Sequence, residues 1–298
     1  MRMTFVPSSF ILSNVSPPFD KLAILAPGLL GASLAMNARG RGLARRITVW
    51  ARRAEVRQAC EGSTWCDEAL AEPEEAARDA DFVVVCTPVS VIAGLTARVA
   101  PVCCEGAILT DVGSTKSLIC REAAAAMPAG RTFVGSHPMA GSEKTGMQHA
   151  DAGLFTGRHC FVTPLDDTAT HAVDRVVRFW RDAGMDVATV SPEQHDEIVA
   201  HISHLPHVLA SVLSSQLAGK PADWPHYAGN GLRDTTRVAA GSPGLWRDIL
   251  EQNREEALRA IEGFEDELHR LKAALHNRQF AAVKSILRRG KEFRDCLT

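Results

Sequence analysis

The stretch Leu22-Ala-Ile-Leu-Ala26-Pro27-Gly28-Leu29-Leu30-Gly31-Ala-Ser-Leu-Ala predicts a buried strand, a tight glycine turn and the start of a helix. Except for Ala26 at the first glycine, it fits the dinucleotide-binding pattern G-x-G-x-x-G. An alanine there hardly alters the backbone path if its φ is negative. The helix N-terminus would offer unpaired N–H groups to a pyrophosphate, although a plain turn between strand and helix is the alternative. The expected cofactor-binding residues are Gly28, Leu29, Leu30 and Gly31.

Outward from this stretch, short apolar strands alternate with helical segments as far as about Val190. Apolar strands separated by helices are typical of a parallel sheet covered on both faces. Ser191-Pro192-Glu193-Gln194 then has the residues of a helix start, and the rest of the chain reads as helices. Helix breaks are expected at Pro206, at 219–225 and at 241–244. The expected strands are Leu22–Ala26, Ile47–Trp50, Phe82–Cys86, Ala107–Thr110, Thr132–Val134, Cys160–Thr163 and Val187–Val190.

The pattern therefore predicts an α/β Rossmann-type domain followed by an all-helical domain. The expected boundaries are residues 1–20 for a loose extension, 21–190 for the first domain and 191–298 for the second. A length of 298 residues agrees with two domains. Within the second domain, apolar residues at helical spacing predict one long helix over Trp246–Leu275.

Composition excludes several classes of protein. Hydrophobic residues make up 46% of the chain and charged residues 23%, which excludes a disordered chain. The formal net charge of −2 leaves no basic excess for general nucleic-acid binding. The eight cysteines form no C-x-x-C pair, which favours reduced thiols in the cytoplasm. We find no run of about 18 apolar residues, so no membrane span is expected.

The end of the second predicted strand bears on the choice between NAD and NADP. An NAD site would place an Asp or Glu there to bind the ribose 2′-hydroxyl, but the sequence has Ala51-Arg52-Arg53. A planar guanidinium pairs well with phosphate, so we favour NADP, with Arg52 or Arg53 at the 2′-phosphate. The alternative is that both arginines are solvated. Thr87 and Pro88 follow another strand, at the edge where open α/β folds bind ligands, and are expected to contact the cofactor.

Two polar segments follow later strands. In Thr110-Asp111-Val112-Gly113-Ser114-Thr115-Lys116, we expect Ser114 either to cap a helix or to bind a substrate hydroxyl. The segment 135–146 is rich in small and polar residues, which predicts a loop that carries His137. An imidazole at the carboxyl end of a strand can accept a proton near neutral pH, so His137 is a candidate base.

The helical half contains a group of histidines and a cluster of charged residues. Zinc sites on one helix usually place two histidines four residues apart, whereas the histidines from His201 to His207 are spaced by three and six. We therefore expect no metal site, and instead a bent helix that presents His204 and His207 to a cleft. Arg237 could bind a substrate carboxylate through two hydrogen bonds, or form an ordinary surface ion pair.

Together these segments resemble the prephenate/arogenate dehydrogenase family, from about Lys21 to Leu271. Their order and spacing are more specific than any one segment. The resemblance implies a Rossmann domain, a helical domain that forms a homodimer, and an active site between them. The matching segments are Gly28-Leu-Leu-Gly31, Asp111-Val-Gly-Ser114-Thr-Lys116, His137-Pro-Met-Ala-Gly-Ser-Glu143-Lys144, Ser203-His-Leu-Pro-His207, Arg233-Asp-Thr-Thr-Arg237 and Trp246-Arg247-Asp248.

The resemblance also implies a reaction and residue roles. Prephenate would be oxidised and decarboxylated to 4-hydroxyphenylpyruvate in tyrosine biosynthesis, with arogenate as the alternative substrate. His137 would take the proton of the ring hydroxyl, and Ser114 would hydrogen-bond the same hydroxyl. His207 and Arg237 would hold the carboxylates, with His204 nearby and Glu143 organising the cleft. Two other readings stay open: a 6-phosphogluconate-type β-hydroxyacid dehydrogenase, and a sensor that binds NADP without turnover.

Overall fold

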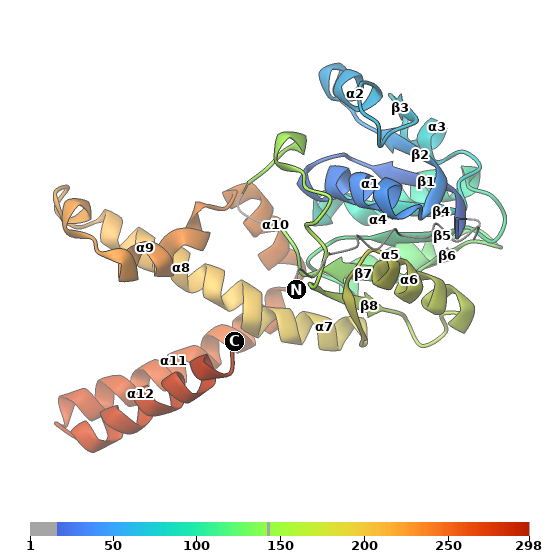
Figure 1. Cartoon of the computed structure of the whole chain (residues 1–298). Helices are drawn as coiled ribbons and strands as arrows, with labels where there is room; N and C mark the ends of the chain where they lie inside the picture. Colours follow the sequence, from blue (N-terminus) through green and yellow to red (C-terminus); the bar gives the residue numbers. More distant parts are fainter. Residues whose placement is uncertain (1–16, 142–143, 298) are drawn as a thin grey trace, which may run out of the picture.

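In the computed structural model, which describes residues 17–141 and 144–297, a six-stranded parallel sheet forms the core of the first half (Figure 1). The strand order β3-β2-β1-β4-β5-β6 reverses direction beside β1, as in dinucleotide-binding folds. Its strands are β1 (Phe19–Leu25), β2 (Ala44–Trp50), β3 (Glu68–Leu70), β4 (Phe82–Val85), β5 (Ile108–Asp111) and β6 (Thr132–Phe133). Most of these were predicted; β3, a short edge strand without an apolar run, was not.

Helices cover both faces of this sheet, because the strand side chains are apolar on both sides. Successive β1 residues alternate between two cores: Leu22 and Ile24 pack on one face, whereas Ala23 and Leu25 pack on the other. The predicted Rossmann-type α/β architecture is thereby confirmed. The helices are α1 (Leu29–Arg41), α2 (Ala54–Glu61), α3 (Pro73–Ala77), α4 (Val89–Val99), α5 (Ser117–Ala125) and α6 (Thr170–Asp182), with a 3₁₀ turn at Ala100–Val102.

The first strand begins before the predicted domain start. Phe19 is buried, and its ring lies 4.3 Å from that of Phe82 and 5.8 Å from that of Phe179. These contacts anchor β1 two residues upstream of Lys21, so the expected extension is wrong for residues 19 and 20. Residues 17 and 18 precede the strand, and residues 1–16 of the expected extension lie outside the described residues.

The last strands form a separate sheet, where the sequence predicted a single parallel one. This sheet has the order β7-β8-β9, with β7 (Gly135–Pro138) antiparallel to β8 (His159–Thr163) and β8 parallel to β9 (Asp186–Thr189). A β-carbon at Gly135 would lie 2.4 Å from the Cys120 Sγ atom, so the backbone approaches α5 as closely as glycine allows. The predicted loop around His137 is therefore wrong at its start, because His137 lies on buried β7.

The second half of the chain is helical, as predicted, and its last two helices extend away from the sheets (Figure 1). Ser191 caps α7, since its hydroxyl accepts a hydrogen bond from the Gln194 backbone at 3.1 Å. The elements are α7 (Pro192–Val199), a π-helical turn (Ala200–His204), α8 (Leu205–Ala218), α9 (Asn230–Thr236), α10 (Pro243–Gln252), α11 (Arg254–His276) and α12 (Phe280–Asp295), with 3₁₀ turns at Met147–His149, Trp224–Tyr227 and Arg237–Ala240.

Two helix predictions need correction. No break occurs at Pro206, because the proline sits in the first turn of α8 and the π-helical turn before it accommodates the missing N–H group. The predicted helix over Trp246–Leu275 is two helices, because the chain bends at the buried Asn253. The Asn253 side-chain amide donates to the backbone oxygen of Asp196 at 2.9 Å, which holds this bend against α7.

By length and composition alone, the continuous helix Pro192–Ala218 could cross a membrane, with a mean hydropathy of 1.2 in its most apolar window. The sequence did not predict this, because polar residues interrupt the apolar ones. Core helices of soluble proteins pass the same test. Here the helix supplies buried polar side chains to a cluster between the two halves of the chain, described below.

Candidate active site

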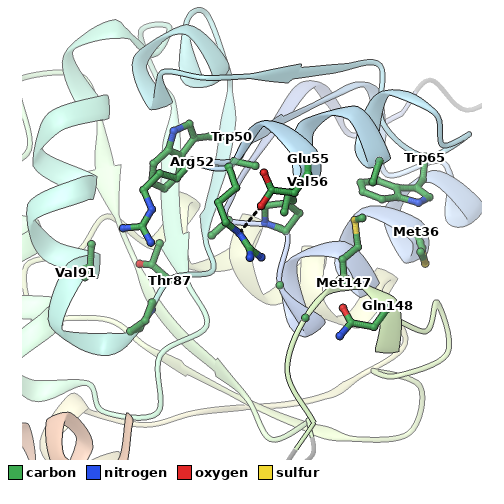
Figure 2. Close-up of a pocket in the computed structure, with 18 residues that line it drawn as sticks. Met36, Trp50, Arg52, Glu55, Val56, Trp65, Thr87, Val91, Met147 and Gln148 are labelled. Atoms are coloured by element: carbon green, nitrogen blue, oxygen red, sulfur yellow. Dashed lines mark ion pairs between the residues drawn. The ribbon is translucent and has the colours of Figure 1, made fainter. Parts of the chain in front are cut away.

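A cavity of about 650 Å³ opens at the carboxyl ends of β1, β2 and β4 (Figure 2). The turn between β1 and α1 forms its floor, with the N-terminus of α1 directed at the space. This is where a parallel sheet with reversed strand order binds dinucleotides. The lining residues are Ala26, Pro27, Gly28, Met36, Trp50, Ala51, Arg52, Arg53, Glu55, Val56, Ala59, Trp65, Thr87, Pro88, Val91, Gly146, Met147 and Gln148.

Two residues of the turn between β1 and α1, Gly31 and Ala26, have unusual backbone surroundings. A β-carbon at Gly31 would lie 2.3 Å from the backbone oxygen of Ala26, so only glycine fits where α1 passes β1. Ala26 has a φ of 77°, so the expectation of a negative φ at this residue is wrong. An alanine in this left-handed region is disfavoured by roughly 1–2 kcal/mol. The tight turn, closed by the Gly28 N–H donating to the Ala26 oxygen at 3.0 Å, holds it there.

Most residues predicted to bind the cofactor line this cavity. Gly28, Arg52, Arg53, Thr87 and Pro88 do so. The Thr87 hydroxyl is buried without a partner among the described residues, which suits a group bound in the cavity. The residues present therefore fit a dinucleotide.

The remaining predicted residues of the turn have other positions. Leu29, Leu30 and Gly31 do not line the cavity; Leu29 opens α1, and Leu30 packs against the apolar core. Their backbone N–H groups, at the start of α1, are what could serve a pyrophosphate.

The two arginines of the cavity differ in their surroundings. Arg53 faces Glu55 across 3.6 Å, so its charge is already partly balanced. Arg52 lies beside Trp50, on the side of the cavity that Thr87 and Val91 occupy (Figure 2). Arg52 is therefore the better placed of the two for an additional anion.

Sequence reasoning missed the apolar wall of the cavity. Trp65 and Met36 come from neighbouring elements, whereas Met147 comes from a 3₁₀ turn far along the chain (Figure 2). The Met147 sulfur lies 3.7 Å from that of Cys60, which packs this turn on α2. No sequence motif marks these residues, because only the folded chain brings them together.

A second set of functional groups lies where the two halves of the chain meet. His137 is buried on β7, and its Nδ1 atom lies 2.9 Å from Nε2 of His195 on α7. Burial, and then the nearby His195 and Lys116, lower the pKa of His137 well below its ordinary value of 6.5. The imidazole is consequently neutral near pH 7 and able to accept a proton.

The partner of His195 is a residue that the sequence did not single out. Asp196 is buried, and its Oδ1 atom lies 2.8 Å from Nδ1 of His195. The same carboxylate accepts hydrogen bonds from the backbone N–H groups of Lys116 at 2.7 Å and Ser117 at 2.8 Å. Asp196 therefore caps α5 from the other half of the chain. The Ser-Pro helix start just before it is the only local signal.

Beside this cluster, Lys116 and Asp111 form an ion pair whose side chains are both fully buried. The Lys116 ammonium also donates to the backbone oxygen of Ser136 at 3.1 Å. Asp111 accepts further hydrogen bonds from the N–H groups of Gly113 at 2.8 Å and Ser136 at 3.0 Å. The pair ties the end of β5 to the residue before His137.

The other predicted histidines gather around Trp246 of α10. The His207 ring stacks on the Trp246 ring with centroids 3.5 Å apart, and the His204 ring meets it edge-on at 6.0 Å. A β-carbon at Gly241 would lie 2.7 Å from the Trp246 Nε1 atom, so glycine makes room for the stack. Burial lowers the pKa of His204 to about 4, and it also lowers that of His207.

The described structure does not bring every predicted site residue into this cluster. Ser114 does not cap α5, since Asp196 does, and the Ser114 backbone lies against the His204 ring. Arg237 is exposed in the 3₁₀ turn that packs on α8. Glu143 lies outside the described residues. His204 and His207 do not line the cavity of Figure 2, so their position at a substrate cleft stays a prediction.

Comparisons with known proteins bear on this arrangement. The family described as "Prephenate dehydrogenase, nucleotide-binding domain" matches residues 34–189, and "Prephenate dehydrogenase, dimerization domain" matches 191–289. A cyclohexadienyl dehydrogenase of Zymomonas mobilis is 31% identical over 261 residues, which cover 86% of this chain and 89% of the relative.

Two solved structures share the fold. A prephenate dehydrogenase of A. aeolicus, in complex with hydroxyphenyl propionate and NAD+, has a TM-score of 0.88 and 30% identity, covering 94% of this chain and 98% of its own. Arogenate dehydrogenase of Synechocystis has a TM-score of 0.81 and 27% identity, covering 93% of this chain and 100% of its own.

Proposed function

This chain belongs to the prephenate dehydrogenase family, and from that premise we propose that it oxidises and decarboxylates prephenate with NADP as the hydride acceptor. As a member of the family it is an NAD(P)-dependent dehydrogenase of tyrosine biosynthesis. Prephenate as the substrate, rather than arogenate, and NADP, rather than NAD, are the finer parts of the proposal. His207 is the residue on which we base the preference for prephenate.

The buried His137 imidazole, with its Nδ1 atom 2.9 Å from His195, is the observation that carries this proposal. One of its ring nitrogens, Nδ1, is engaged by His195, which leaves Nε2 as the nitrogen that can face a substrate. The cavity opens at the carboxyl ends of β1 and β4, and His137 lies on β7, where the backbone N–H of the preceding Ser136 donates to Asp111 at the end of β5. A base beside a nicotinamide site is what oxidation of a hydroxyl requires.

The chain's own residues then have these roles in the reaction. His137 accepts the proton of the ring hydroxyl at Nε2, and Ser114 hydrogen-bonds that hydroxyl and orients His137. A bound NAD(P) supplies the acceptor for the hydride that leaves the same carbon. The ring carbon that bears the carboxylate is joined to the resulting dienone carbonyl through the ring C=C bonds, so loss of CO2 has an electron sink and gives the aromatic product.

The remaining polar groups would bind the two carboxylates of the substrate. Arg237 and His207 are proposed for this role, with His204 beside them and Glu143 organising the cleft. Carboxylate binding by a guanidinium is charge-assisted and geometrically specific. Exclusion of water by the apolar Trp246 stack would strengthen these contacts.

The direct test is a spectrophotometric assay of cofactor reduction by the purified protein, with prephenate or arogenate and with NADP or NAD. We expect the highest kcat/KM with prephenate and NADP. Absence of reduction with both substrates would refute the dehydrogenase assignment for this chain. A preference for arogenate, or for NAD, would refute the corresponding finer part alone.

Arg52→Ala is expected to raise the KM for NADP by about 10- to 100-fold, the value of a charge-assisted hydrogen bond. The KM for NAD should stay unchanged, because NAD has no 2′-phosphate for the guanidinium to bind. Arg53→Ala is the matched control, since Glu55 already balances that charge. Equal effects of Arg52→Ala on the two cofactors would contradict the assignment.

Arg237→Ala should raise the KM for prephenate by about 10-fold or more, with a smaller change in kcat, because a carboxylate would lose its charged partner. Steady-state kinetics at saturating NADP measure both constants. Arg233→Ala, one helical turn earlier and exposed, is the control. A loss confined to kcat would place Arg237 in another role.

The proposal extends to the assembly and its setting. Of the large apolar side chains exposed among the described residues, all but Val91 lie in the helical half, including Leu268 and Phe280 on the extended helix pair α11–α12. We propose that a second copy covers them in a homodimer, in agreement with the dimerisation-domain match. We also propose that the boundary between the two domains lies between residues 190 and 191. The free thiols support a cytoplasmic location. We propose no role for nucleic acid or membrane.

A further inference from the structure

The mechanism proposed above does not use His195 or Asp196, although both are almost completely buried. His195 is 0% exposed and Asp196 is 2% exposed. Both ring nitrogens of His195 are occupied, one by His137 at 2.9 Å and the other by Asp196 at 2.8 Å. The three side chains form a continuous chain of hydrogen bonds from the helical half into the α/β half.

The carboxylate at the far end of this chain is held in one orientation and one charge state. Its two oxygens accept hydrogen bonds from the backbone N–H groups of Lys116 and Ser117, at the first turn of α5. Although burial raises the pKa of Asp196, the hydrogen bonds from His195 and Ser117 outweigh it and keep the pKa below its ordinary value. An ionised carboxylate can only accept hydrogen bonds.

The protons of the two imidazoles follow from that carboxylate. His195 must carry its proton on Nδ1 to donate to Asp196, so in neutral His195 the Nε2 atom holds a lone pair. His137 must then donate from Nδ1 to that lone pair, which leaves Nε2 of His137 unprotonated. This is the tautomer that a base acting through Nε2 requires.

The charged and titratable groups around the two rings maintain the neutral state on which this order depends. Burial lowers the pKa of His195 despite the attraction of Asp196, and the Lys116 ammonium adds to the lowering. Lys116 and His204 act in the same direction on His137. Asp111, which is paired with Lys116, raises the pKa of His195 as Asp196 does, but burial outweighs both.

Packing also fixes the plane of each ring. The His137 and His195 rings meet at 67° with centroids 5.1 Å apart, and Phe161 of β8 lies edge-on to His195 at 5.4 Å and 83°. Asn253 holds Asp196 from behind through its backbone oxygen at 2.9 Å. The His195 ring therefore has no room to turn and exchange its two nitrogens.

We propose that His195 and Asp196 are positioning residues that hold His137 in the Nδ1-protonated tautomer and orient its Nε2 atom toward the substrate. The inference rests on the proposed function, in which His137 is the base. When His137 gains the hydroxyl proton, its positive charge meets the lone pair of His195, whose opposite N–H stays bonded to Asp196. His195 and Asp196 lie on α7, whereas His137 lies on β7. The tautomer and orientation of His137 therefore depend on the packing of the helical half against the α/β half.

The test compares two substitutions of His195. His195→Phe keeps a planar ring but cannot accept the Nδ1 proton, so we expect kcat to fall by about 10²–10⁴-fold, the range for an imidazole in the wrong tautomer. His195→Gln offers an amide oxygen to the same proton and should recover most of kcat. The KM for substrate and the Kd for NADP should stay unchanged in both. His171→Phe, an exposed histidine on α6, is the control.

A second readout reports the tautomer without turnover. In protein labelled with ¹⁵N-histidine, the His137 resonances, identified by their loss in His137→Asn, should show a bare Nε2 and a protonated Nδ1. Tautomers should mix in His195→Phe and return to one in His195→Gln. Should His195→Phe fail to fold, the native tautomer and the glutamine variant still decide the matter.

The outcomes separate this inference from the proposed function. A native His137 with its proton on Nε2, or an undiminished kcat in His195→Phe, would overturn the positioning role. If the unaltered protein reduces no cofactor with either substrate, the proposed function fails while the ¹⁵N spectrum still tests the tautomer.

Discussion

His137→Asn is expected to lower kcat with prephenate by about 10²–10⁴-fold, the usual contribution of a general base. The asparagine amide can still donate to His195, so the cluster stays intact while the group that takes the hydroxyl proton is lost. The KM for prephenate and the Kd for NADP should change little. The loss corresponds to roughly 3–5 kcal/mol in activation free energy.

His159→Asn is the matched control, because His159 lies on the neighbouring strand β8 but is exposed. An unchanged kcat in His137→Asn would remove the base assignment. The pH profile gives an independent check in the unaltered enzyme. Only neutral His137 can accept a proton, and its pKa is lowered, so activity should be retained below pH 6.5 and be lost as the pH falls through that lowered pKa.

Lys116→Met should lower the free energy of unfolding by about 3–5 kcal/mol, because it leaves the Asp111 charge buried without its partner. Methionine fills a similar volume, so lost packing contributes little. Urea unfolding at a fixed protein concentration measures the change, since the proposed dimer would make stability depend on concentration. The acid limb of activity should also move to higher pH, because Lys116 is one of the groups that lower the pKa of His137.

Arg254→Met tests whether the loss of stability in Lys116→Met depends on the burial of its ion pair. Arg254 pairs with Glu255 at the surface, with the two side chains 68% and 70% exposed, and exposed pairs contribute about 0–1 kcal/mol. The double variant Asp111→Asn/Lys116→Met should recover part of the loss. If Lys116→Met costs no more than Arg254→Met, the buried pair does not hold the end of β5 in place.

Local sequence carries enough information to identify several elements of this fold. Gly31 is required because any β-carbon would collide with the backbone of Ala26, and this requirement follows from the turn itself. The α7 start could be predicted for the same reason, since Ser191 and Pro192 act within one turn. By contrast, the residues that end β6 and begin β7 look like a loop, because the need for glycine at position 135 comes from the Cys120 sulfur and the Thr163 hydroxyl, which only the fold brings beside it.

The residues of the candidate site likewise fall into those that the sequence could identify and those that it could not. His137, Ser114 and His204 could be proposed from their residue types and from their positions after strands or on a helix. Asp196 could not, because its function depends on the two N–H groups of α5, 79 and 80 residues earlier in the chain. The wall of the cavity likewise needs Met147, brought to α2 by a turn that has no motif of its own.

By itself, the sequence determined the α/β and helical halves, the dinucleotide turn and the family, and it pointed to His137 as a candidate base. These features depend on contacts between near neighbours, or on the order of several short motifs. Only the tertiary structure decided that β7 leaves the first sheet, that Ala26 adopts a positive φ, and that Asp196, His195 and His137 form one hydrogen-bonded chain. Burial removes water from that chain, so its protons are set by partners that are distant in sequence.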